Sequence, residues 1–99
     1  MGENKHIVYI LKCNDGTFYT GYTNHLKRRL KQHKMGKGAK YTRGRGPFEV
    51  VYMKRFSTKQ EALKEEYAIK QLSRKEKEQL ILMYKEEVKK IEHSKKLPK

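Results

Sequence analysis

The most restrictive feature of this sequence is an apolar run, from His6 to Cys13, that a turn signal separates from a second strand-like run. The first run is apolar on both alternating faces and rich in β-branched residues, which is typical of a strand covered on both sides. Asn14-Asp15-Gly16 is a turn signal, and the segment from Thr17 to Tyr22 is expected to return as the second strand. We therefore expect a hairpin whose first strand is central in its sheet.

The length of the hairpin loop decides which side chains share a face, and the turn sequence allows two lengths. A two-residue loop, Asp15-Gly16, places Tyr9 and Tyr19 on opposite faces of the sheet. A three-residue loop with Gly16 in the left-handed conformation pairs Tyr9 with Gly21 and places both tyrosines on one face. We predict the second arrangement, because a G1-type bulge prefers glycine at this position and because a site shared by the tyrosines requires it.

A helix, a loop and a third strand are expected after the hairpin. Thr23-Asn24 offers an N-cap for a helix over about residues 25–34. Residues 35–47 are rich in Gly, Lys and Arg without a helical or strand period, so they are expected to form a loop. The apolar residues return over 48–56, which predicts the third strand.

Two further helices are expected in the last part of the chain. A capping-box signature over residues 57–61 opens a helix that reaches about Leu72. The same signature over residues 73–76 opens a second helix, roughly 74–92, almost without a linker. Residues 93–99 are polar and are expected to form a disordered tail.

The expected element order is β-β-α-β-α-α. This order gives an α/β fold, with a three-stranded, mainly antiparallel sheet and helices packed on its faces. At 99 residues the chain fits one domain, which we place at residues 1–92. Its single cysteine, Cys13, is expected to be a buried structural thiol. No apolar run approaches the ~18 residues of a membrane span, so we expect a cytoplasmic protein without a membrane partner.

The charge of the chain is strongly positive and unevenly placed. There are 25 Lys and Arg against 11 Asp and Glu, a net charge of +14, and no acidic residue lies between Asp15 and Glu49. The cations of that segment are Lys27, Arg28, Arg29, Lys31, Lys34, Lys37, Lys40, Arg43 and Arg45. Interleaved glycines and Tyr41 would let the backbone approach a phosphate chain and a ring stack on a base. We expect nucleic-acid binding here, and the alternative is a solvated, flexible loop.

Around this basic segment the sequence resembles the GIY-YIG nuclease superfamily over most of the chain. The first family motif appears as Val8-Tyr9-Ile10, with its glycine replaced, and the second as Tyr19-Thr20-Gly21. Thr23-Asn24 precedes Arg29, where the family places its invariant arginine, and His33 follows one turn later. The segment 38–47 and the pattern Glu66-x-x-Ile-Lys are similar to the small single-domain bacterial members, the YhbQ/YazA group. They are also similar to the nuclease domain of structure-specific resolvases.

The resemblance implies metal-assisted hydrolysis of a DNA strand, and it implies roles for the two tyrosines. Tyr9 is the candidate general base, with Tyr19 as its partner in ordering or activating the water. A tyrosine with an ordinary pKa near 10 is a poor base at pH 7, so we expect neighbouring cations to lower this pKa. The alternative is that both rings are ordinary core residues of their strands.

The resemblance also implies roles for residues of the helices. Arg29 would hold the scissile phosphate and His33 would orient it or take part in proton transfer, although spacing alone does not separate Arg29 from Arg28. Glu66 would bind one Mg²⁺ or Mn²⁺ ion, although Lys70 at i+4 is an alternative partner for it. The helical wheel places Glu65 in the same arc as Glu66, and only the family pattern chooses Glu66. The residues expected to contact nucleic acid are Gly21, Lys27, Arg28, Lys31, Lys34, Lys37, Lys40, Tyr41, Arg43 and Arg45.

Two functions from different classes are compatible with these residues. The first is a metal-dependent endonuclease acting on DNA, including branched, nicked or single-stranded forms, in repair or recombination. The alternative is a non-catalytic module that binds DNA or RNA and acts with a partner protein that supplies specificity. The set of Tyr9, Tyr19, Arg29 and Glu66 favours the first function, whereas the small size of the chain favours the second.

Overall fold

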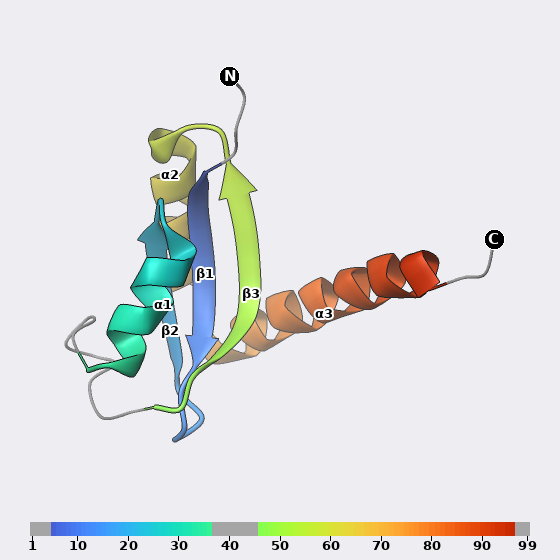
Figure 1. The fold of residues 1–99 in the computed structure, drawn as a ribbon, viewed down its shortest axis with the longest axis horizontal. Coiled ribbons are helices and arrows are strands. Elements are labelled where there is room, and N and C mark those ends of the chain that lie inside the picture. The colour runs from blue at the N-terminus through green and yellow to red at the C-terminus, as the bar shows by residue number, and fades with distance from the viewer. Residues whose placement is uncertain (1–4, 37–45, 97–99) are drawn as a thin grey trace.

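The computed structural model describes residues 5–36 and 46–96, with side chains described as far as residue 90 (Figure 1). The elements follow the predicted order β-β-α-β-α-α. They are β1 (His6–Lys12), β2 (Phe18–Thr23), α1 (Leu26–Lys34), β3 (Glu49–Phe56), α2 (Lys59–Lys70) and α3 (Arg74–Lys96). The strands form one antiparallel sheet in the order β2-β1-β3, so the prediction that the first strand is central is confirmed.

The hairpin between β1 and β2 has the three-residue loop. Its ladder pairs Tyr9 with Gly21 and Leu11 with Tyr19, as predicted. The Cys13 N–H donates to the Thr17 carbonyl at 2.8 Å, which closes the loop. Gly16 has φ +85°, a conformation that a residue with a side chain adopts only with strain. The predicted register is therefore confirmed.

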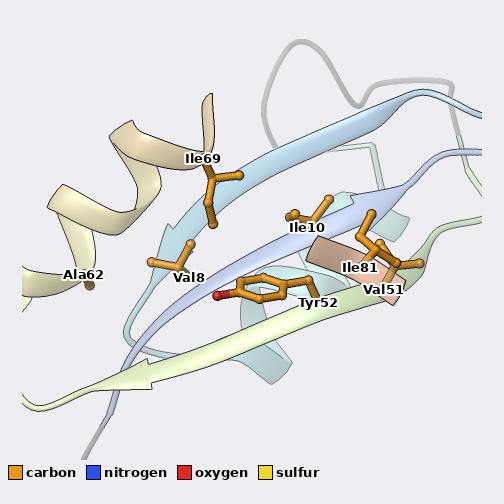
Figure 2. Close-up of a cluster of buried hydrophobic side chains, with 7 residues drawn as sticks. All are labelled: Val8, Ile10, Val51, Tyr52, Ala62, Ile69 and Ile81. Atoms are coloured by element: carbon orange, nitrogen blue, oxygen red, sulfur yellow. The ribbon is translucent and has the colours of Figure 1, made fainter. Parts of the chain in front are cut away.

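The main hydrophobic core lies between the sheet and the two later helices (Figure 2). The cluster consists of Val8, Ile10, Val51, Tyr52, Ala62, Ile69 and Ile81. Because side chains alternate along a strand, the residues between these on β1, including Tyr9, turn to the opposite face. That face is the one in front of which α1 lies in Figure 1. Cys13 is buried, as predicted.

The helix starts follow the predicted capping at α2 and α3 and depart from it at α1. At α3 the Ser73 hydroxyl accepts from the Glu76 N–H at 3.2 Å and the Glu76 carboxylate accepts from the Ser73 N–H at 2.8 Å, which is the predicted capping box. The Thr58 hydroxyl accepts a hydrogen bond from the Glu61 N–H at 3.2 Å, so the predicted cap of α2 is confirmed. At α1 the N-cap is His25 and not Thr23-Asn24, because the His25 side chain accepts from the Arg28 N–H at 3.4 Å. The Thr23 hydroxyl accepts from the His25 N–H at 3.0 Å, one step before the helix begins.

The last helix is longer than the sequence indicated. We expected α3 to end near residue 92 and a tail to follow, but α3 continues to Lys96. Residues 93–96 include neither glycine nor proline, and Pro98 disfavours helix at the residue before it, which explains a later end. Residues 97–99 lie outside the described residues. No helix in the described parts of the chain is long and apolar enough to cross a membrane.

Candidate active site

The two tyrosines of the hairpin lie together because a glycine leaves room for them. Tyr9 is fully buried and lies opposite Gly21 in the ladder. A Cβ atom on residue 21 would lie 2.6 Å from the Tyr9 hydroxyl and 3.0 Å from Cε2 of Tyr19. The ring centroids of Tyr9 and Tyr19 are 6.4 Å apart. The prediction that both rings project from one face is therefore confirmed.

His33 joins this pair from the last turn of α1. His33 is 2 % exposed, and its Nε2 lies 3.0 Å from the Tyr9 hydroxyl. The ring also meets Tyr19 edge-to-face at 5.4 Å and Phe48 at 5.9 Å between centroids. His33 is the buried residue of α1, and it lies among three aromatic rings on the sheet side of the helix.

Arg29, one turn before His33, is half-buried. Its side chain hydrogen-bonds with the side chains of both Tyr9 and Tyr19. Nη1 of Arg29 also donates to Oε1 of Gln32 at 3.0 Å, which holds the guanidinium from the helix side. Arg28 is exposed, so the arrangement separates two arginines that spacing had left equivalent.

Burial sets the protonation of this cluster. It raises the pKa of Tyr9 to about 12, more than the hydrogen bond from Arg29 lowers it. The pKa of His33 is lowered by burial first and by the charge of Arg29 second. At pH 7 Tyr9 is therefore protonated and His33 is neutral. The expectation that nearby cations lower the tyrosine pKa is wrong for Tyr9, because loss of hydration outweighs the attraction of one guanidinium.

The two glutamates of α2 that the sequence left equivalent face different surroundings. Glu65 accepts a hydrogen bond from the Tyr52 hydroxyl at 3.1 Å. Glu66 forms an ion pair with Lys70 at 3.2 Å, and its side chain is 19 % exposed. The charge of Glu66 is also among the causes that raise the pKa of Tyr9, so this carboxylate lies within electrostatic reach of the tyrosines. Among the described residues, no three His, Cys, Asp or Glu side chains are grouped as a ready-made metal site.

The residues expected to contact nucleic acid divide into three groups. Exposed cations on α1 are Lys27, Arg28, Lys31 and Lys34. Gly21 is buried and gives room to Tyr9, a packing role that the sequence reasoning did not assign to it. Lys37, Lys40, Tyr41, Arg43 and Arg45 lie outside the described residues.

Two residues around the site were missed by the sequence reasoning. Gln32, which holds Arg29, could have been found from its i+3 spacing on the helix. Phe48, which packs on His33, carried no local signal because the two residues meet only after the chain folds back.

Comparison with known proteins agrees with this geometry. A family model described as "GIY-YIG catalytic domain" matches residues 5–79. The chain therefore belongs to the GIY-YIG family of nuclease domains. The UPF0213 protein OB0043 of Oceanobacillus iheyensis is 63 % identical over 79 residues, which cover 80 % of this chain and 92 % of that protein. The UPF0213 protein YazA of Bacillus subtilis is 51 % identical over 78 residues, covering 79 % of each chain.

Two solved structures are similar to this fold. The solution structure of the UPF0213 protein BH0048 from Bacillus halodurans has a TM-score of 0.54 and 58 % identity, and covers 79 % of this chain and 83 % of that one. The solution structure of EF2693 from E. faecalis has a TM-score of 0.59 and 44 % identity, and covers 83 % and 88 % respectively. Both support the α/β arrangement of three strands and three helices.

Proposed function

We propose that this protein is a metal-dependent endonuclease that hydrolyses phosphodiester bonds in DNA at the cluster formed by Tyr9, Tyr19, Arg29, His33 and Glu66. The observation that carries the proposal is the position of Arg29, whose guanidinium hydrogen-bonds with two tyrosine side chains on one face of the sheet. Family membership supports nuclease chemistry at this face. Such an enzyme would act in the cytoplasm, in DNA repair or recombination.

Arg29 is the residue that meets the substrate first. A guanidinium presents two parallel N–H groups that match two phosphate oxygens, and it stays charged at every relevant pH. In the proposed complex Arg29 exchanges its hydrogen bonds with the tyrosines for hydrogen bonds with the scissile phosphate. This exchange frees the hydroxyls of Tyr9 and Tyr19 for the attacking water.

Tyr9 acts in the proposed reaction as a proton relay and not as a base on its own, since a pKa of about 12 disfavours its deprotonation at pH 7. The half-buried Tyr19 orders the water. A proton of this water passes to the Tyr9 oxygen while the Tyr9 proton passes to Nε2 of His33, which lies 3.0 Å away and is neutral. The water oxygen then bonds to phosphorus as the bond to the leaving sugar oxygen breaks.

Glu66 is the residue that would hold the metal. One partly exposed carboxylate whose present partner is a surface lysine suits Mg²⁺ or Mn²⁺, which take one or two carboxylates together with water and phosphate oxygens. The ion would supply charge stabilisation for the phosphate oxygens and the leaving group. Glu65 is less suited, because Tyr52 already hydrogen-bonds with its carboxylate on the core side of α2.

A second candidate function is a non-catalytic module that binds DNA or RNA and acts with a partner protein. The observation that favours it is the complete burial of Tyr9, which in this conformation no water reaches. This function predicts salt-dependent binding without metal-dependent cleavage.

The test compares two neighbouring glutamates of α2. Purified protein is incubated with supercoiled, single-stranded and branched DNA, in Mg²⁺ or Mn²⁺ and in EDTA. Glu66→Gln should abolish cleavage and leave binding nearly intact, because it removes a metal ligand and not a phosphate contact. Glu65→Gln is the matched control, with the same loss of charge one residue away, and should cleave normally. Cleavage by Glu66→Gln at the normal rate would refute the metal assignment, and binding without any cleavage by the unsubstituted protein would favour the second function.

A further inference from the structure

A depression lies on the same face of the sheet as the tyrosines, at the start of β1. It has a volume of about 440 Å³, and its apolar surface comes from Ile7 on β1 and from Leu26 and Leu30 on α1. None of these three residues has a role in the proposed reaction. The depression is therefore a separate surface on the same face of the sheet as the candidate active site.

The strand register explains why this surface adjoins the site. Side chains two residues apart on a strand share a face, so Lys5, Ile7 and Tyr9 follow one another along one side of the sheet. Arg55 on β3 pairs with Ile7 and therefore turns to the same face. At about 3.3 Å per residue, Lys5 lies about 13 Å from Tyr9 along the strand. That is roughly four steps of a nucleic-acid strand with one charge per 3.4 Å.

The rim of the depression is positively charged. It is formed by Lys5 just before β1, Lys27 on α1 and Arg55 on β3, and all three side chains are exposed. Among the described residues that line it, none is acidic. Cations that converge without a carboxylate over an apolar surface suit a ligand that carries phosphates on a less polar frame.

We propose that this depression binds the strand of the substrate beyond the scissile phosphate. Lys5 and Arg55 each contact a phosphate, and Ile7, Leu26 and Leu30 contact the sugars between them. The strand then runs from Arg29 along β1 toward its first residue. Only the direction of the strand rests on the proposed nuclease function, because binding of a phosphodiester chain at these cations needs no cleavage.

The experiment measures binding alone, in EDTA, so that catalysis plays no part. A short fluorescent DNA oligonucleotide is titrated at several salt concentrations with the unsubstituted protein, Lys5→Gln and Arg55→Gln. The matched control is Lys54→Gln, which removes the same charge from the neighbouring residue of β3, on the opposite face beside the Phe56 ring. We expect Lys5→Gln and Arg55→Gln each to reduce the slope of log K against log salt by about 1. Lys54→Gln should leave that slope unchanged.

The outcomes separate this inference from the proposed function. Equal slopes for Arg55→Gln, Lys5→Gln and Lys54→Gln would overturn the assignment of the depression, even if the unsubstituted protein cleaves DNA. If Lys5→Gln and Arg55→Gln weakened binding to poly-glutamate as much as binding to DNA, the assignment would also be overturned, because the cations would then attract any polyanion. Failure of the unsubstituted protein to cleave DNA in Mg²⁺ would refute only the proposed nuclease function. Lys5 precedes the first strand, so Lys5→Gln remains a valid test even if Arg55→Gln unfolds.

Discussion

Gly21 lies directly opposite Tyr9 in the hairpin, and the Tyr9 hydroxyl occupies the space that a side chain on residue 21 would need. The 2.6 Å approach to a Cβ at this position is shorter than van der Waals contact allows, and the atom concerned belongs to a fully buried ring. The glycine is therefore a packing requirement of the site.

Gly21→Ala should destabilise the protein by about 1–3 kcal/mol, the usual cost of overpacking a core. It should also abolish cleavage, because the Tyr9 ring has to leave its position beside His33. Denaturant unfolding and nicking assays measure the two effects. Replacing Tyr9 as well, in Tyr9→Leu with Gly21→Ala, should cost less stability than the sum of the single changes. Additive losses would mean that the two residues do not compete for the same space.

Substitutions of the adjacent residues Arg29 and Arg28 should have very different effects on cleavage. Arg29→Ala removes the guanidinium that hydrogen-bonds with both tyrosines, so we expect cleavage to fall by about 10²–10³-fold, the effect typical of a lost charge-stabilising donor. Arg28→Ala removes an exposed cation and should weaken DNA binding modestly without changing the rate of cleavage by bound protein. Single-turnover cleavage at saturating protein separates the two effects. Comparable rate losses in the two variants would remove Arg29 from the site.

Because His33 is buried, the free energy of unfolding should fall as the solution is made acidic. Its pKa in the folded protein lies below the ordinary value of 6.5, so the unfolded chain takes up the proton first. This contribution is fully present above pH 6.5 and is lost as the pH falls through the lowered pKa. The measurement is urea unfolding between pH 5 and 8. His33→Gln should flatten the dependence in this range, whereas His25→Asn, which keeps a good N-cap at α1, should not.

Arg74 links the start of α3 to the hairpin, and this link should contribute to the stability of the fold. Its guanidinium donates to the Gly16 carbonyl at 2.9 Å and lies 4.3 Å from the centre of the Phe18 ring. Arg74→Ala should destabilise the protein by about 1–2 kcal/mol, the sum expected for an exposed cation–π contact and one hydrogen bond. Thermal unfolding beside Lys75→Ala, an exposed neighbour in the same turn, measures the difference. Equal melting temperatures for the two variants would show that the contact contributes nothing.

The order of the elements, the central strand and the hairpin register were all predictable from the sequence. Each depends on local chemistry: alternation and β-branching along β1, and a glycine at the loop position that needs positive φ. The cap of α2 at Thr58 was predictable for the same reason, since the hydroxyl and the amide it binds are three residues apart. The cap of α1 was not, because Thr23, Asn24 and His25 all offer acceptors and their order of preference depends on where β2 ends.

The sequence by itself determined which residue types meet at the candidate site, since the motifs bring two tyrosines, an arginine and a histidine to one face of a hairpin and its following helix. Only the tertiary structure gave different surroundings to neighbouring residues that spacing had left equivalent. Helical periodicity leaves Glu65 and Glu66 in one arc, and contact with Tyr52 on another strand separates them. Burial also decided the pKa of Tyr9, because hydration is lost only when distant segments cover the ring, and no local pattern records that loss.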